Sequence, residues 1–88
     1  MKDFNYELLA RKYAGFFILL QNTKISTTSL RELKFIHGND FKKVFLKCYP
    51  IIEKILKEKG FCLNKEKGLK NKTIYICTKT LDNKFSLY

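Results

Sequence analysis

Residues 33–60 read LKFIHGNDFKKVFLKCYPIIEKILKEKG, and this pattern predicts a short strand followed by two helices. The break at residues 37–40 ends on Asp40, a residue type whose side chain accepts backbone N–H groups of a helix's first turn. A helix is therefore predicted to begin near Asp40. Its apolar residues recur at helical spacing on one face: Phe41, Val44, Phe45 and Cys48. Because a residue before proline is disfavoured in the helical region, this helix is predicted to end at Tyr49.

The second helix of the pair is predicted to begin at Pro50, since proline suits the first helical position. Gly60 is its predicted stop. The apolar stripe of this helix comprises Ile51, Ile52, Ile55 and Leu56, and its other side carries Glu53, Lys54, Lys57 and Glu58.

The N-terminal third predicts a helix, a loop and a strand. Asp3 can cap a helix whose apolar residues keep a helical period up to Leu20, while Gly15 weakens it by roughly 1 kcal/mol and leaves a break there open. Residues 21–29 are rich in Ser, Thr and Asn, which hydrogen-bond to their own backbone and predict a loop. Apolar and charged residues alternate over residues 30–36, which predicts a half-buried strand.

The C-terminal third predicts a β-hairpin. The apolar run 61–63 is predicted to pair with residues 73–78 (TIYICT), which are β-branched or aromatic almost throughout. Between them, residues 64–72 form a charged tip around Gly68. Residues 81–84 predict a second turn, after which residues 85–88 can return as a third strand.

Helix, strand, helix, helix, strand, charged loop and strand is the element order of a winged-helix domain. We therefore predict an α+β fold, a single small winged-helix-like domain over residues 1–88, with three helices and a two- or three-stranded antiparallel sheet. The predicted core comprises Leu8, Leu9, Phe16, Phe35, Phe41, Phe45, Ile52, Ile55, Leu56, Ile74 and Ile76.

Length and composition limit the class of protein. A chain of 88 residues with 45% hydrophobic residues has enough apolar material for one modest core. The longest apolar run, residues 14–20, is far shorter than the roughly 20 residues that span a bilayer, and Lys2-Asp3 without a cleavage site argues against a signal peptide. The chain as given is therefore expected to be a soluble piece.

The three cysteines, Cys48, Cys62 and Cys77, and the single His37 match no zinc spacing. An odd count argues against a disulfide framework, so buried, reduced thiols in a cytosol-like compartment are expected. His37 beside a glycine is more typical of a turn than of a general base, and no carboxylate pair or phosphate-binding glycine spacing is present. We predict no enzyme activity, no metal and no cofactor.

The net charge of +10 favours an acidic partner. Of the 18 basic residues only Arg11 and Arg31 are arginine. An AT-rich coding sequence produces the same lysine-rich composition, so the charge is only partial support for an acidic partner. The candidate partner-binding residues are Lys65, Lys67, Lys70 and Lys72. A solvated hairpin tip is the alternative interpretation of these four lysines.

Some residues resemble a known family. KFIHGNDF, with Phe35 to Phe41 ahead of an amphipathic helix, and LDNKFSLY at residues 81–88 are similar to stretches in the N-terminal cytosolic domain of the Sec-sixty-two family of endoplasmic-reticulum translocation proteins, and Lys12-Tyr13 is a weaker echo. The chain departs from the family in ending on Tyr88, where an indole side chain is usual, and in lacking the membrane segments.

This resemblance implies a non-catalytic accessory subunit of the protein-conducting channel in post-translational import, on the cytosolic face of the endoplasmic reticulum membrane. It implies membrane attachment through segments that are not in this chain. Its implied partners are the channel and an acidic segment of a J-domain translocon protein, which agrees with the positive charge.

The alternative is a winged-helix nucleic-acid-binding protein of the nucleus or cytoplasm. Duplex DNA requires lysines aligned on the helix 50–59 and on the wing, whereas an acidic peptide requires only one groove or strand edge. Glu53 and Glu58 on that helix, together with its lack of Arg, Asn and Gln, argue against base-specific reading of DNA.

Overall fold

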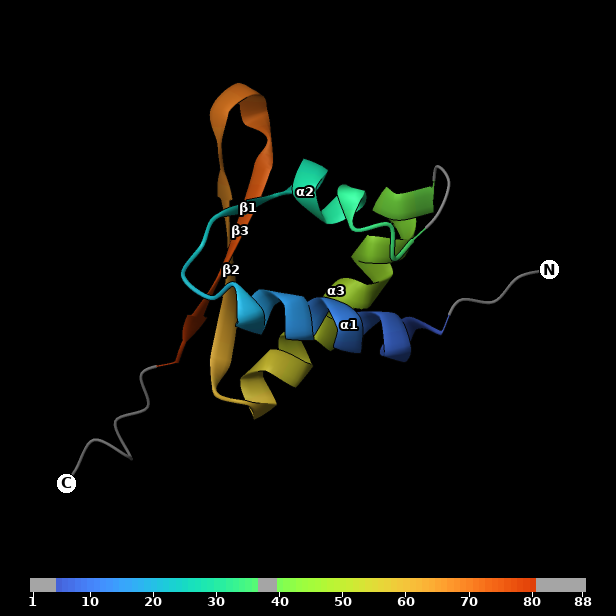
Figure 1. Cartoon of the computed structure of the whole chain (residues 1–88), viewed down its shortest axis with the longest axis vertical. Helices are drawn as coiled ribbons and strands as arrows, with labels where there is room; N and C mark the ends of the chain where they lie inside the picture. The colour runs from blue at the N-terminus through green and yellow to red at the C-terminus, as the bar shows by residue number, and fades with distance from the viewer. Residues whose placement is uncertain (1–4, 37–39, 81–88) are drawn as a thin grey trace.

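The computed structural model describes residues 5–36 and 40–80. Its elements follow in the order α1 (Tyr6–Leu19), β1 (Ile25–Ser26), α2 (Thr27–Glu32), α3 (Phe41–Glu58), β2 (Phe61–Lys67), a 3₁₀ turn η2 (Leu69–Asn71) and β3 (Thr73–Lys79). The strands form one antiparallel sheet in the order β1-β3-β2 (Figure 1). The protein therefore has the predicted α+β, winged-helix-like fold, with three helices and a three-stranded sheet.

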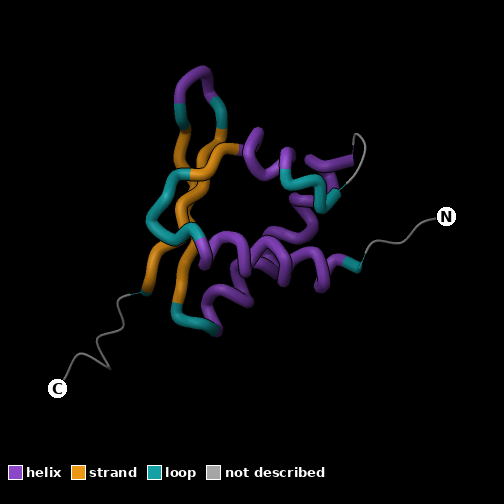
Figure 2. Tube along the Cα trace, viewed as in Figure 1, coloured by secondary structure: helices purple, strands orange, loops and turns teal. Residues whose placement is uncertain are grey.

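The helices gather on one side of the strands (Figure 2). The largest side chains that are almost completely buried in the core between these layers are those of Tyr13, Phe17, Leu30, Cys48, Ile52, Leu56 and Cys77. Tyr75 joins the layers, because its ring contacts Phe17 of α1 and both Phe45 and Tyr49 of α3. No helix among the described residues has the length and apolar character needed to cross a membrane.

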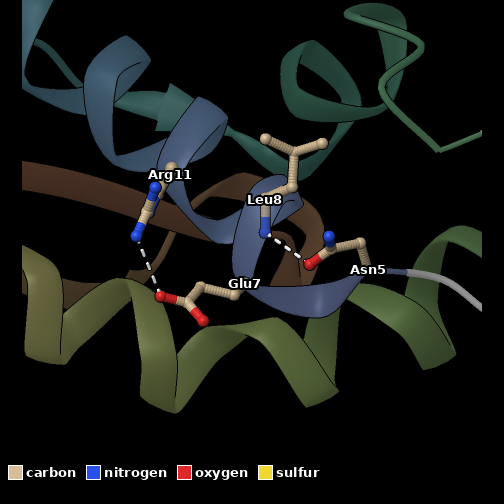
Figure 3. Close-up of polar contacts among 4 residues, drawn as sticks. All are labelled: Asn5, Glu7, Leu8 and Arg11. Carbon is tan, nitrogen blue, oxygen red and sulfur yellow. Dashed lines mark hydrogen bonds and ion pairs between the residues drawn. The ribbon is translucent and has the colours of Figure 1, made fainter.

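Helix α1 begins one residue after Asn5, whose Oδ1 accepts the backbone N–H of Leu8 at 3.0 Å (Figure 3). The cap predicted at Asp3 lies outside the described residues. On the same helix Glu7 and Arg11 form an exposed i,i+4 ion pair at 3.0 Å. Gly15 does not break α1: it is exposed, while Ala14 and Phe17 on either side are buried and hold the helix against the core.

The prediction that Tyr49-Pro50 separates two helices is wrong, since α3 runs without interruption from Phe41 to Glu58. Proline removes the N–H that would bond to the carbonyl four residues earlier, here that of Leu46. Pro50 is exposed and Leu46 is 62% exposed, so water can reach this part of the helix. The buried residues form one continuous face across the proline: Phe41, Val44, Phe45, Cys48, Ile52 and Leu56.

Helix α3 begins and ends where the sequence predicts a helix start and a helix stop. The helix starts directly after Asp40, although the Asp40 side chain makes no capping hydrogen bond. It stops before Gly60, whose φ of 85° lies in the left-handed region where glycine is favoured.

The strand predicted over residues 30–36 is also wrong. The first strand lies earlier, at β1, and residues 27–32 are the short helix α2. Ser26 explains the difference, because its Oγ accepts the backbone N–H of Ser29 at 3.2 Å and caps a helix where a serine-rich loop was expected. The order of elements is still that of a winged helix, with α2 and α3 as the helix pair.

The hairpin is longer than predicted, and β2 pairs with β3 from Phe61↔Lys79 to Lys67↔Thr73. Tyr75 and Cys77 point into the core, so the alternate residues Ile74 and Ile76 lie on the opposite face of the sheet and are only half-buried. Their predicted core role is wrong because the sequence pattern does not distinguish the two faces of this strand.

The other residues predicted to lie in the core differ in how far they are buried. The prediction for Leu8 is wrong, since its side chain is 50% exposed on the outer side of α1. Phe16, Phe35 and Ile55 are partly buried against the core. The remaining five are buried as predicted: Leu9, Phe41, Phe45, Ile52 and Leu56.

Tyr13 is fully buried and its hydroxyl has no hydrogen-bond partner among the described residues. Burial, with a smaller contribution from Cys48, raises the pKa of Tyr13 from 10.0 to about 12. The folded state therefore holds this proton more tightly than the unfolded chain, and the corresponding stability is present below about pH 10 and lost as the pH rises towards 12.

We expect Tyr13→Phe to remove this loss. Between pH 8 and pH 11 the wild-type unfolding free energy should fall by about 1 kcal/mol more than that of the variant, a difference that urea titrations at the two pH values measure. At neutral pH the variant should be at least as stable, because the buried hydroxyl has no partner to lose. A variant with an equal alkaline loss, or one less stable at neutral pH, would contradict the assignment.

Candidate binding surface

Two of the four candidate lysines lie in strand β2 rather than in a loop. Lys65 and Lys67 are separated by one residue, so their side chains leave the same face of the sheet as the buried Phe61 and Leu63. Lys65 Nζ lies 4.8 Å from the centre of the Tyr49 ring on α3. Lys65 therefore bridges the hairpin and the middle of α3.

The other two candidates, Lys70 and Lys72, lie at the tip. Lys70 belongs to η2 and has a φ of 59°, and the next residue, Asn71, has a φ of 62°. The tip closes through the backbone N–H of Gly68, which donates to the Lys72 carbonyl at 2.6 Å. Leu69 on this tip is 87% exposed. The four lysines thus share one hairpin, and Lys65 contacts helix α3 through Tyr49.

Tyr49 is the aromatic partner that the sequence interpretation missed. Burial, followed by the charge of Glu53 and by Tyr75, raises the pKa of Tyr49 to about 12. The ring is therefore neutral at physiological pH, and its contact with the Lys65 ammonium is a cation–π interaction. The contact depends on a strand that extends as far as Lys65. The predicted strand ends at residue 63, so the sequence pattern places Lys65 in a loop and does not indicate the contact with Tyr49.

Helix α3 adds a second group of exposed lysines. Lys43, Lys47 and Lys54 are spaced by four and seven residues, so they follow the solvent side of α3 past Pro50. The two acidic residues of α3 lie outside this row of lysines. Glu58 lines a groove with Glu7, Arg11 and Lys59, and Glu53 lines a different groove against β2. Dividing the helix at Pro50 concealed this stripe in the sequence.

The groove between α3 and β2 has a volume of about 390 Å³. Phe61 and Leu63 supply buried aromatic and aliphatic side chains to its wall. Its other lining residues are Glu53, Lys57, Cys62 and Thr80. This groove adjoins β2, the strand that carries Lys65 and Lys67.

The cysteines differ from expectation at one position. Cys48 and Cys77 are buried thiols, and burial raises the pKa of both. Cys62 is exposed, with Sγ 3.3 Å from Thr78 Oγ1, so its predicted burial is wrong. Within residues 5–36 and 40–80, no three His, Cys, Asp or Glu residues are grouped as a metal site would require. His37 lies outside the described residues.

Compared with known protein families, with curated proteins and with solved structures, the chain has no match. The resemblance to translocation proteins therefore stays a prediction. The structural features that bear on function are the basic hairpin, α3 and the groove between them.

Proposed function

We propose that this chain is a non-catalytic interaction domain that binds an acidic protein segment through the basic β2–β3 hairpin and the adjoining side of α3. The contact of Lys65 with Tyr49 is the observation that carries the proposal, because it joins the charged hairpin to the helix beside an apolar groove. An acidic segment would meet lysines along the hairpin and apolar surface next to them. The net charge of +10 would speed the encounter.

We further propose a setting at the protein-conducting channel of the endoplasmic reticulum, where the acidic segment would belong to a J-domain partner. Its support is the sequence resemblance and the charge. Two residues that carry the resemblance have packing roles here: Phe35 meets Tyr13 edge-on at 5.0 Å, and Phe41 stacks on Phe45 at 5.4 Å. These residues would be needed for the fold whatever the partner, so the setting depends on identifying that partner.

A nucleic-acid-binding function is the second candidate, favoured by the unbroken α3. In a winged helix the second helix of the pair can enter the major groove, and Lys43, Lys47 and Lys54 lie on the solvent side of α3. Helix α3 has no Arg, Asn or Gln, the side chains that grip base edges in two places. Binding of this kind would be to phosphates, without strong sequence preference.

Two charge-reversal variants of the full chain separate these functions. The hairpin variant changes Lys65, Lys67, Lys70 and Lys72 to Glu, and the matched control changes Lys12, Lys43, Lys47 and Lys54 to Glu. Each is titrated at physiological salt with polyglutamate and with duplex DNA. The hairpin variant should bind polyglutamate about tenfold to several hundredfold more weakly, because four exposed contacts contribute up to about 1 kcal/mol each, while the control should lose much less.

Equal loss in both variants would mean that polyglutamate responds to net charge alone, and would overturn the hairpin as the site. DNA affinity of about 10⁻⁴ to 10⁻⁶ M is expected for any protein this basic and favours neither function. One duplex bound about a thousandfold more tightly than others would establish the nucleic-acid function instead.

A further inference from the structure

Strand β2 is at the edge of the sheet, since the strand order is β1-β3-β2. The backbone N–H of Thr80 donates to the Gly60 carbonyl at 2.8 Å, and that of Gly68 donates to the Lys72 carbonyl at 2.6 Å. These two bonds fix the phase of the ladder: even-numbered residues of β2 bond to β3, and odd-numbered residues direct N–H and C=O groups outward. The outward groups belong to Phe61, Leu63, Lys65 and Lys67.

No described segment of the chain pairs with this outer edge. The strand has seven residues, which is long for an unpaired edge that native proteins usually shorten or cover. A free edge of this length provides the backbone groups with which an extended peptide can form an additional strand.

The side chains beside the edge determine which peptide it accepts. At one end of β2, the groove against α3 has Phe61 and Leu63 in its wall and can take an apolar side chain. At the other end, Lys65 and Lys67 leave the same face of the strand and favour carboxylates. A second copy of β2 would add its own Lys65 and Lys67 to the same short edge, and this accumulation of positive charge disfavours pairing between two chains.

We propose that the outer edge of β2 binds an extended acidic segment as a fourth strand, with an apolar side chain in the α3–β2 groove and carboxylates near Lys65 and Lys67. This inference rests on the proposed function and specifies its mode of binding. The backbone of β2 supplies affinity, the lysines select acidic sequences, and the groove sets the register.

The probe is the acetylated peptide Glu-Thr-Glu-Thr-Val-Thr-Glu-Thr-Glu, used with the full ¹⁵N-labelled chain. In an extended strand its Val and Glu side chains leave one face, so Val can enter the groove while Glu faces Lys65 and Lys67. Two analogues carry N-methyl groups, one on every Thr and the other on Val and every Glu. Alternate N–H groups of a strand point to opposite edges, so edge pairing requires one analogue to lose at least about tenfold in affinity while the other binds like the parent peptide. Amide hydrogen exchange at Leu63 and Lys65 should slow on binding, whereas Cys62 and Asn64, already bonded to β3, should change little.

The outcomes separate the two proposals. If both analogues bind like the parent and the Leu63 and Lys65 amides exchange as fast as before, the segment docks by charge alone; edge pairing is then overturned and the proposed function stands. Loss of both analogues without new protection at these amides also overturns edge pairing. If the parent peptide does not bind, the proposed function fails with it.

Discussion

Ile52→Ala is expected to lower the free energy of unfolding by about 2–5 kcal/mol, the range for removing most of a buried isoleucine side chain. Ile52 is completely buried, near the middle of the apolar face of α3. For a domain of this size the total stability is on the order of 4–13 kcal/mol, so the variant should lose a large share of it. Urea denaturation followed by circular dichroism measures the change.

Ile55→Ala is the matched control, three residues further along the same helix. The sequence pattern places Ile55 in the core, but its side chain is only partly buried and lines the groove between α1 and α3. Its replacement should therefore cost clearly less than that of Ile52. Equal losses in the two variants would mean that the buried face of α3 is centred elsewhere.

Pro50→Ala is expected to stabilise the protein, by up to about 3 kcal/mol. Inside a helix proline costs about that much relative to alanine, because it removes one hydrogen bond and its ring crowds the preceding turn. Pro50 is exposed and eight residues of α3 follow it, so alanine would restore the missing N–H without losing a core contact. Thermal unfolding should show a higher midpoint.

Lys54→Ala serves as the control for Pro50, since it places alanine at another exposed position one turn later. Its effect should stay within about 0.5 kcal/mol, as is usual for surface substitutions. If Pro50→Ala were neutral or destabilising, the conformation that proline imposes on α3 would itself contribute to packing.

The sequence predicts the fold better than it predicts the element boundaries. The hairpin is visible because β-branched and aromatic residues mark β3, and Gly60 correctly ends α3. The predicted helix end before Pro50 is wrong because it depends only on the local preference of proline against helix. The free energy gained by burying the continuous apolar face of α3 is larger than the cost of the proline. Element order survived these errors because α2 took the place of one predicted helix and β1 that of the misplaced strand.

The binding surface was predictable only as a set of charges. Four lysines near Gly68 are evident in the sequence, but their division between strand and tip depends on the register of β2 against β3. A one-residue change of register would have moved Lys65 to the opposite face. Its position over Tyr49 is a tertiary contact between residues that are 16 positions apart, and no local pattern reports it.

The position of Lys65 over Tyr49 also bears on the entropy of binding. A free lysine side chain samples many rotamers, and ordering it costs up to about 2 kcal/mol. The Tyr49 ring restricts Lys65 before any partner arrives, so part of this cost is met during folding. Lys70 is exposed at the hairpin tip and would bear the full cost when it is ordered. Among the hairpin lysines, Lys65 should therefore contribute more binding free energy per charge than Lys70.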